Sequence, residues 1–245
     1  MKPYEPLPRF FVEDLPQENA LGELPDESSA AAKARRVRPE DMIELVDGRG
    51  GIVRAKVGDI KKRSVTYLAV HRRHVEKPKT SISLIQSIPK MDRAEWILQK
   101  TTELGVDRIF FAHTDHSVPV KSAAILERWQ RIAIEALRQC GRAYLPTISL
   151  FDALDPALDA LPSGGFRILC NETEDRKTLV DVLTSRSPKP TELWLAVGPE
   201  GGWSTPEIQK FMKKSFYSAS LGDNVLRVET AAMVSVAIAA ALCYN

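Results

Sequence analysis

The sequence predicts an α/β protein in which a parallel sheet follows a small β-rich domain. After residue 80, apolar runs alternate with helix-like segments, as strands and helices do in a parallel sheet covered on both faces. Before residue 75, short strands dominate, and two of them flank a glycine-rich turn at residues 47–51. The charged run at residues 76–79 reads as a linker. We therefore predict two domains, residues 1–74 and residues 75–245.

The N-terminal domain is predicted to contain strands of alternating polarity and one short helix. The helix is rich in alanine and basic residues, and Pro39 is expected to end it because proline cannot continue a helix. A hairpin is expected around the glycine-rich turn. In chain order the elements are a strand at 9–12, a helix at 28–38, and strands at 42–46, 52–57 and 64–70.

The C-terminal domain is predicted to alternate strand and helix to its end. No internal repeat interrupts this order. The expected strands are residues 82–88, 108–112, 147–150, 166–170, 193–197 and 216–221, and the expected helices are residues 92–104, 122–140, 177–183, 204–212 and 230–242.

The charge is distributed unevenly, although the net charge is only +2. Residues 33–73 contain twelve Lys and Arg against five Asp and Glu, a local excess of +7. Such a segment favours an anionic partner such as a nucleic-acid backbone, and a solvated charged surface explains it equally well. A stripe of basic residues on helix 122–140 can likewise be explained by an anionic partner or by a solvated charged surface.

The cysteine usage and the apolar tracts indicate a cytoplasmic protein without a membrane segment. The three cysteines form no CxxC pair, which is typical of reduced thiols in the cytosol. The most apolar tract, residues 231–243, is too short to span a bilayer, so we expect a helix buried in the core or against another subunit. No metal-ligand motif is evident in the two HxxH pairs, and we predict no metal.

A glycine loop at residues 198–202 follows one predicted strand and precedes a helix. It lacks the Lys and Ser/Thr of a phosphate-binding loop, and Glu200 would repel a triphosphate. A neutral or cationic cofactor with ribose hydroxyls fits the loop better, and S-adenosylmethionine is such a ligand. The alternative is a tight structural turn before a helix. That helix is expected to begin with a capping box of Ser204 and Glu207, or with Thr205 as the N-cap and Pro206 at its first position.

A second loop begins at residue 221 and ends at the last predicted helix. Arg227, Glu229 and Thr230 stand at the head of this otherwise apolar helix, where polar groups need partners. They are candidates for a functional site. The alternative is a capping network in which Glu229 lies favourably at the helix N-terminus and Arg227 pairs with a carboxylate.

These stretches together resemble the bacterial 16S ribosomal RNA uracil-N3 methyltransferases, which belong to the SPOUT superfamily. The resemblance rests on GPEGG at residues 198–202 and on LGDNVLRVETA at residues 221–231. Two further motifs support it, QKTTELGV at residues 99–106 and EALRQCGR at residues 135–142. The N-terminal domain matches mainly through Arg9-Phe10 and the hairpin.

The resemblance implies a fold, a cofactor and partners. The expected fold is a trefoil-knotted methyltransferase domain after a PUA-like β-barrel that binds RNA. The expected partners are 16S ribosomal RNA in the small ribosomal subunit and a second copy of the chain, in a homodimer. S-adenosylmethionine is expected to contact Leu169, Cys170, Asn171, Val197, Gly198, Glu200, Gly201, Gly202, Leu221, Gly222, Leu226, Arg227 and Thr230.

The implied reaction is methyl transfer to N3 of a uridine, with Arg227 as the stabiliser of the developing anion and Glu229 as its orienter or as the base. Asp223 and Asn224 depart from the Pro-Arg that the family usually carries there, and this leaves a non-catalytic RNA-binding protein as the alternative. The residues expected to hold RNA are Arg9, Arg35, Arg36, Arg38, Arg54, Lys61, Lys62, Arg131, Arg138 and Arg142.

Overall fold

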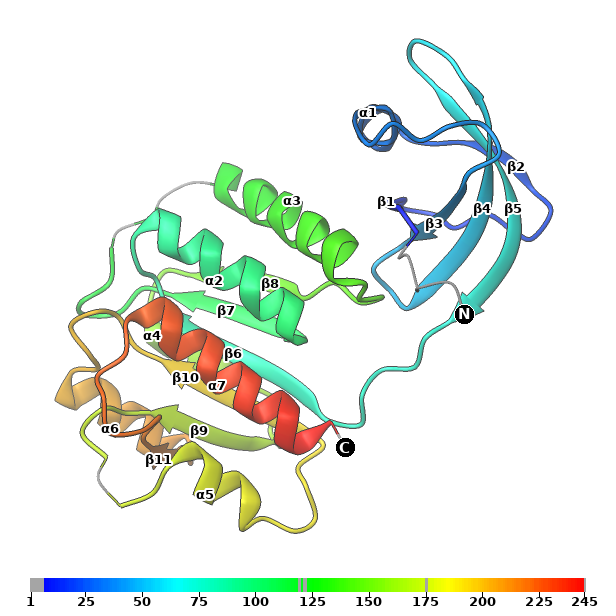
Figure 1. Ribbon diagram of the computed structural model, residues 1–245. Helices are drawn as coiled ribbons and strands as arrows, with labels where there is room; N and C mark the ends of the chain where they lie inside the picture. Colours follow the sequence, from blue (N-terminus) through cyan, green and yellow to red (C-terminus); the bar gives the residue numbers. More distant parts are fainter. Residues whose placement is uncertain (1–6, 119, 121–122, 175, 245) are drawn as a thin grey trace. The chain divides into compact units, whose positions relative to one another are not determined.

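The computed structural model describes residues 7–118, 120, 123–174 and 176–244, and it divides the chain into two compact units (Figure 1). Unit 1 comprises Met1–Lys77 and Ile134–Leu145, and unit 2 comprises Pro78–Ala133 and Pro146–Asn245. The segment at residues 134–145 is therefore grouped with the N-terminal part, although it follows the predicted linker in sequence. The division of the protein into functional domains at residue 74 stays a prediction.

Unit 1 is built on a five-stranded sheet in the order β1-β3-β4-β5-β2. β1 pairs with β3 in parallel, and the other neighbours are antiparallel. The apolar side chains of β3 and β4 face a core that contains Phe10, Ile43 and Leu45. The elements are β1 (Arg9–Phe11), β2 (Leu21–Glu23), α1 (Asp26–Ala34), β3 (Met42–Val46), β4 (Gly51–Ile60) and β5 (Val65–His74).

The β3–β4 hairpin forms at the predicted glycine-rich turn. Gly48 and Gly50 adopt φ angles of 69° and 98°, a region that glycine enters without steric cost. The Asp47 carboxylate accepts hydrogen bonds from the backbone N–H groups of Arg49 and Gly51, at 2.8 and 3.0 Å. This is the local bonding by which aspartate specifies turns.

The helix predicted at residues 28–38 is wrong in its bounds, because α1 spans Asp26–Ala34. Two acidic residues in the first turn favour the earlier start, since carboxylates are stabilised at a helix N-terminus. Arg36 has a φ of 56°, which reverses the chain before Pro39 is reached. β2 was not predicted, and its three residues lack the alternation of a half-buried strand.

Unit 2 is built on a six-stranded parallel sheet in the order β11-β9-β10-β6-β7-β8. α2, α5 and α7 pack together over one face of it, and α4 and α6 lie on the other face (Figure 1). The strands are β6 (Ser81–Ser87), β7 (Arg108–Ala112), β8 (Thr147–Phe151), β9 (Phe166–Cys170), β10 (Glu192–Val197) and β11 (Tyr217–Ala219). The helices are α2 (Met91–Leu104), α3 (Ala123–Cys140), which continues into unit 1, α4 (Leu154–Asp159), α5 (Leu179–Thr184), α6 (Thr205–Lys213) and α7 (Val228–Cys243).

The predicted parallel α/β architecture is confirmed in unit 2. β10 lies between β9 and β6, and its residues from Leu193 to Val197 are almost wholly buried, as expected of a central parallel strand. The carboxyl ends of β9, β10 and β11 meet at one edge of the sheet. Ligand sites of parallel α/β folds lie at such edges.

Candidate functional site

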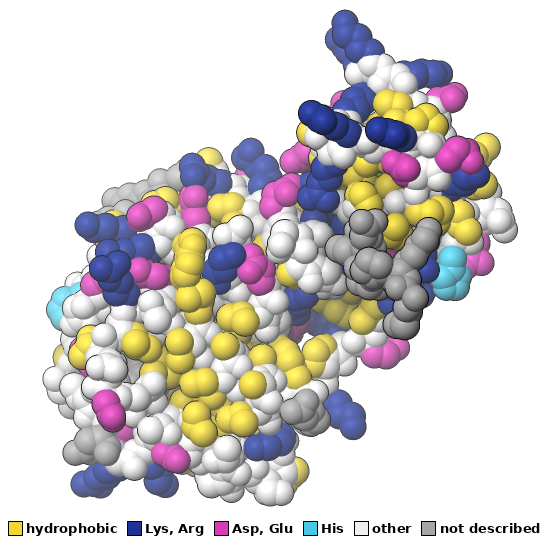
Figure 2. All heavy atoms as spheres, in the orientation of Figure 1, with side chains coloured by type: hydrophobic (Ala, Val, Ile, Leu, Met, Phe, Trp, Pro, Cys, Tyr) yellow, Lys and Arg dark blue, Asp and Glu magenta, His cyan; other side chains and the backbone are white. Residues whose placement is uncertain are grey.

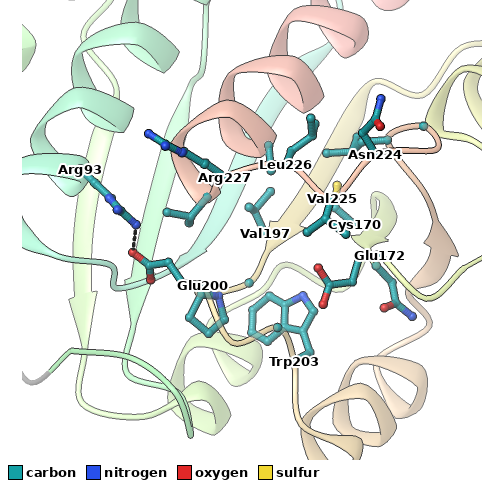
Figure 3. A pocket seen from close by; sticks show the side chains of 18 of the residues that line it. Arg93, Cys170, Glu172, Val197, Glu200, Trp203, Asn224, Val225, Leu226 and Arg227 are labelled. Carbon is teal, nitrogen blue, oxygen red and sulfur yellow. Dashed lines mark hydrogen bonds and ion pairs between the residues drawn. The ribbon is translucent and has the colours of Figure 1, made fainter.

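A cavity of about 320 Å³ lies in unit 2 at the carboxyl ends of β9 and β10. Four segments line it, namely the start of α2 through Arg93, the end of β9 with the residues after it, the glycine loop after β10, and the loop that leads into α7 together with the first turns of that helix. The two loops predicted as site candidates therefore form walls of one pocket. Figure 3 shows side chains of the residues that line it.

The glycines of the first loop let other groups come close to its backbone. A Cβ atom on Gly198 would lie 3.2 Å from the Trp203 indole, and one on Gly202 would lie 2.9 Å from Oε1 of Glu172. Gly202 also has a φ of 70°, which a side chain would strain. The loop is thus bordered by Trp203 on one side and by Glu172 on the other.

The helix after this loop is fixed by the predicted cap. Oγ of Ser204 accepts a hydrogen bond from the N–H of Glu207, and the Glu207 carboxylate accepts one from the N–H of Ser204. Glu207 also accepts from the N–H of Asp115 at 2.9 Å, and Ser204 donates to the Asp115 side chain. The start of α6 is therefore tied to the loop after β7.

The second loop has no regular structure between β11 and α7. The strand predicted to run to Leu221 ends at Ala219, and Gly222 adopts a φ of 128°. α7 begins at Val228, so the backbone of Arg227 forms the N-terminal boundary of the helix. Backbone groups and side chains from Leu221 to Val228 face the pocket.

The charged groups of the pocket are unevenly paired. Arg93, from the first turn of α2, forms an ion pair with Glu200 of the first loop (Figure 3). Its Nε atom lies 3.8 Å from Oε2 of Glu229 at the start of α7. Within the described residues, the side chains of Arg227 and Glu172 form no hydrogen bond or ion pair.

Cys170 contributes a neutral wall to the pocket. Burial raises the pKa of its thiol to about 12. At neutral pH the side chain is therefore protonated, and it is unsuited to act as a nucleophile or as a base.

Most residues predicted to contact a cofactor line this cavity, and three do not. Leu169 belongs to the apolar core, and neither Gly201 nor Thr230 reaches the pocket surface. Arg93, Glu172 and Trp203 also lie on the pocket surface but were not predicted. Arg93 lies on α2, far from the loops in the chain, Glu172 belongs to no recognised motif, and Trp203 follows the glycine motif directly but was not assigned to the site. The predicted residues on the pocket surface are Cys170, Asn171, Val197, Gly198, Glu200, Gly202, Leu221, Gly222, Leu226 and Arg227.

Of the residues predicted to hold RNA, Arg9 and Arg138 lie inside unit 1. Nε of Arg9 lies 2.8 Å from the Glu44 carboxylate, and Nε of Arg138 donates to the backbone carbonyl of Arg9. Both side chains are at least nine-tenths buried, so the basic stripe predicted on helix 122–140 is interrupted at Arg138.

Other predicted cations lie on the surface of unit 1. Figure 2 shows Lys and Arg side chains gathered at the turn between β4 and β5. Arg142 is only partly exposed, and Arg131 is exposed in the part of α3 that belongs to unit 2. The exposed candidates of unit 1 are Arg35, Arg36, Arg38, Arg54, Lys61 and Lys62.

The described residues contain no group of three or more His, Cys, Asp and Glu side chains that could hold a metal ion. None of the described helices is long and apolar enough to cross a membrane.

Two family models match the chain. The model of an RNA methyltransferase domain matches residues 75–240, which include both loops and all the described strands of unit 2. The model of an RNA methyltransferase PUA domain matches residues 31–66.

Curated relatives carry the name ribosomal RNA small subunit methyltransferase E. The protein of Synechocystis is 30% identical over 202 residues, which cover 82% of this chain and 66% of that protein. The protein of Buchnera aphidicola is 29% identical and covers 94% of this chain and 91% of its own length.

Solved structures resemble the whole chain. The small subunit methyltransferase E of Neisseria gonorrhoeae, bound to S-adenosyl methionine, superposes with a TM-score of 0.89 at 31% identity and covers 96% of this chain and 98% of its own. A putative methyltransferase of Legionella pneumophila, also in complex with this cofactor, superposes with a TM-score of 0.86 at 27% identity, with the same coverage.

Proposed function

The chain belongs to the RNA methyltransferase family whose domain model spans residues 75–240, and from this premise we propose its reaction. We propose that it transfers a methyl group from S-adenosylmethionine to N3 of a uridine in the 16S ribosomal RNA of the small subunit. The observation that carries this proposal is the single pocket formed by the two motif loops. The names of the curated relatives and the cofactor bound in two similar solved structures support the same proposal.

The pocket has the size and chemistry for this cofactor. Its volume of about 320 Å³ is within the usual range of small-molecule sites. The unpaired carboxylate of Glu172 suits a ligand with cationic groups, and Gly198 and Gly202 leave room for the Trp203 and Glu172 side chains beside the loop. Cys170, Val197 and Leu226 offer apolar surface for a flat ring (Figure 3).

When bound, S-adenosylmethionine supplies an activated methyl group. The protein therefore has to orient the substrate base and to stabilise the negative charge that develops as N3 loses its proton. Arg227 lines the pocket without a partner among the described residues, and this makes it the cation for that charge. Glu229 is the second catalytic candidate, as the base for the N3 proton or as an orienting group.

Unit 1 is the proposed RNA-binding part. Its exposed cations neutralise phosphates and position the RNA without reading its sequence. This role is consistent with the PUA match over residues 31–66. Arg9 and Arg138 are left out of the proposed RNA surface because their guanidinium groups are used inside the unit.

The homodimer, the trefoil knot and the cytoplasmic location remain part of the proposal. α7 supports the homodimer, because apolar residues such as Met233, Ala237 and Ile238 are only partly buried along it. Figure 2 shows hydrophobic side chains over this region of unit 2. A second copy that covered this apolar surface would remove it from water.

The reaction is tested with small ribosomal subunits from cells that lack the modification. The subunits are incubated with the protein and methyl-labelled S-adenosylmethionine, and the 16S RNA is digested to nucleosides. The label is expected in 3-methyluridine at one position, and Arg227→Gln should lower its rate on the order of a hundredfold. Label in a cytidine or on a ribose would refute the proposed reaction.

A further inference from the structure

We propose that Arg93 is a positioning residue of this site, which holds Glu200 and Glu229 and so keeps Arg227 free for the substrate. The inference rests on the proposed function, because it assigns a role within the same reaction. Arg93 lies outside both motif loops, and it joins them to each other from α2.

The guanidinium of Arg93 uses two different nitrogens for the two carboxylates. One terminal nitrogen contacts Oε1 of Glu200, and Nε lies 3.8 Å from Oε2 of Glu229. Glu200 belongs to the loop after β10, whereas Glu229 belongs to the first turn of α7. A planar guanidinium can serve two acceptors in this way, and the single ammonium of a lysine cannot do so with the same geometry.

Arg93 and Glu229 are partly buried, whereas Glu200 is exposed. The exposed fractions are 30% for Arg93, 37% for Glu200 and 17% for Glu229. Oε2 of Glu229 is fully buried and has no hydrogen-bond partner among the described residues. Arg93 is therefore the cation on which this buried oxygen depends.

The location of Arg93 is not explained by the stability of its own helix. It lies in the first turn of α2, where the helix dipole disfavours a cation. Asp92, in the same turn, satisfies the usual preference for a carboxylate there. The two ion pairs across the pocket account for an arginine at this position.

The contact between Arg93 and Glu229 affects Arg227, which stands two residues before Glu229. If Glu229 were not held by Arg93, Arg227 at the N-terminal boundary of the same helix would be a cation close to it in sequence. An ion pair between Arg227 and Glu229 would neutralise the charge that we assign to the developing uracil anion. Arg93 prevents this by keeping Glu229 directed toward α2.

The test measures cofactor binding and single-turnover methylation in four proteins, namely the wild type, Arg93→Gln, Arg93→Lys and Glu95→Gln. Glu95→Gln is the matched control, since it removes a different ion pair of α2, the one with Arg128, outside the pocket. Arg93→Gln is expected to lower the methylation rate about tenfold or more. The RNA KM should stay within about threefold of the wild-type value, because the lost contact orients Glu229 and does not bind RNA. Arg93→Lys should recover part of the rate, and Glu95→Gln should match the wild type.

A double-mutant cycle with Glu229→Gln asks whether Arg93 acts through Glu229. Once Glu229 is neutral it cannot capture Arg227, so Arg93→Gln should cost less than about twofold in that background. The same tenfold loss in both backgrounds, or no loss in either, would overturn the inference. If Arg93→Gln does not fold, Arg93→Lys is taken through the same cycle, and a rate equal to that of the wild type overturns the inference.

Failure of the proposed function gives a different result. In that case the wild type neither binds S-adenosylmethionine in a calorimeter nor methylates small subunits. A wild type that binds and methylates, with Arg93 variants that do the same, leaves the proposed function intact and removes only the role of Arg93.

Discussion

Individual residues determine the shape and the charge of this pocket. Gly198 and Gly202 admit neighbours to within van der Waals contact of the loop backbone. Arg227 presents an unpaired cation among the described residues, whereas Arg93 uses its charge on Glu200. The chemistry assigned to the site therefore depends on which charges are satisfied internally and which remain available.

Gly202→Ala should weaken the binding of S-adenosylmethionine. The added Cβ would lie 2.9 Å from Oε1 of Glu172, and the φ of 70° strains any side chain. We expect the calorimetric dissociation constant to rise about fivefold, because the Glu172 carboxylate and the strained loop must shift, and this change of the pocket wall costs on the order of 1 kcal/mol. Gly164→Ala is the control, because no atom lies within 4 Å of its Cβ position. Equal affinities in the two variants would contradict the assignment of the loop.

The thiol of Cys170 should resist alkylation in the folded protein. Because burial raises its pKa to about 12, the thiolate fraction at pH 8 is on the order of one in ten thousand. Iodoacetamide is expected to label the partly exposed Cys140 first, as followed by mass spectrometry of peptides, and to reach Cys170 only in denaturant.

The same shift destabilises the folded state at high pH. As the pH rises through the thiol range of the unfolded chain, only the unfolded chain releases this proton, so the free energy of unfolding falls. In the alkylation experiment, labelling of Cys170 by iodoacetamide at the rate of Cys140 in the folded protein would contradict the burial of Cys170.

At the scale of elements, the site consists of parallel strands that end at a common edge and helices that begin beside it. The cap of α6 fixes the first loop through Ser204, and the start of α7 fixes the second. α2 packs against α7, and this brings Arg93 to the loops. Each loop is therefore held by a helix terminus.

Ser204→Ala should destabilise the protein and also weaken cofactor binding. Loss of the capping hydroxyl is expected to cost about 1 kcal/mol in urea denaturation, because one N–H at the start of α6 loses its partner. Thr178→Ala is the matched control, since Thr178 and Asp181 form the same type of capping box on α5, away from the pocket. Both variants should lose similar stability, and only Ser204→Ala should lose affinity for the cofactor. A loss of affinity in both would mean that the effect is global.

Sequence periodicity predicted those elements whose own residues determine them. Strands with continuous apolar runs, such as β7 and β9, have their predicted bounds. α4 was not predicted, because its six residues are too few to show helical periodicity. The glycine loops could be recognised from local residues, but Arg93 could not, since only the packing of α2 against α7 brings it to the site.

At the scale of the whole molecule, acidic and basic functions are separated along the chain. The exposed cations of unit 1 suit an RNA backbone, whereas the pocket of unit 2 contains the carboxylates of Glu172, Glu200 and Asp223. The acidic residues that offset the basic segment lie mainly in residues 1–32, which contain two Lys and Arg against seven Asp and Glu, so a net charge of only +2 is compatible with a locally basic surface. The local charge of each part decides what that part binds.

The central claim is that the two motif loops form one S-adenosylmethionine pocket, and a crystal structure grown with the cofactor tests it most directly. We expect cofactor density in contact with Gly198 and Leu226, with the Arg227 side chain at the edge of the same cavity. Cofactor density elsewhere on the chain, or an empty pocket in a protein that binds the cofactor in solution, would refute the assignment of the pocket.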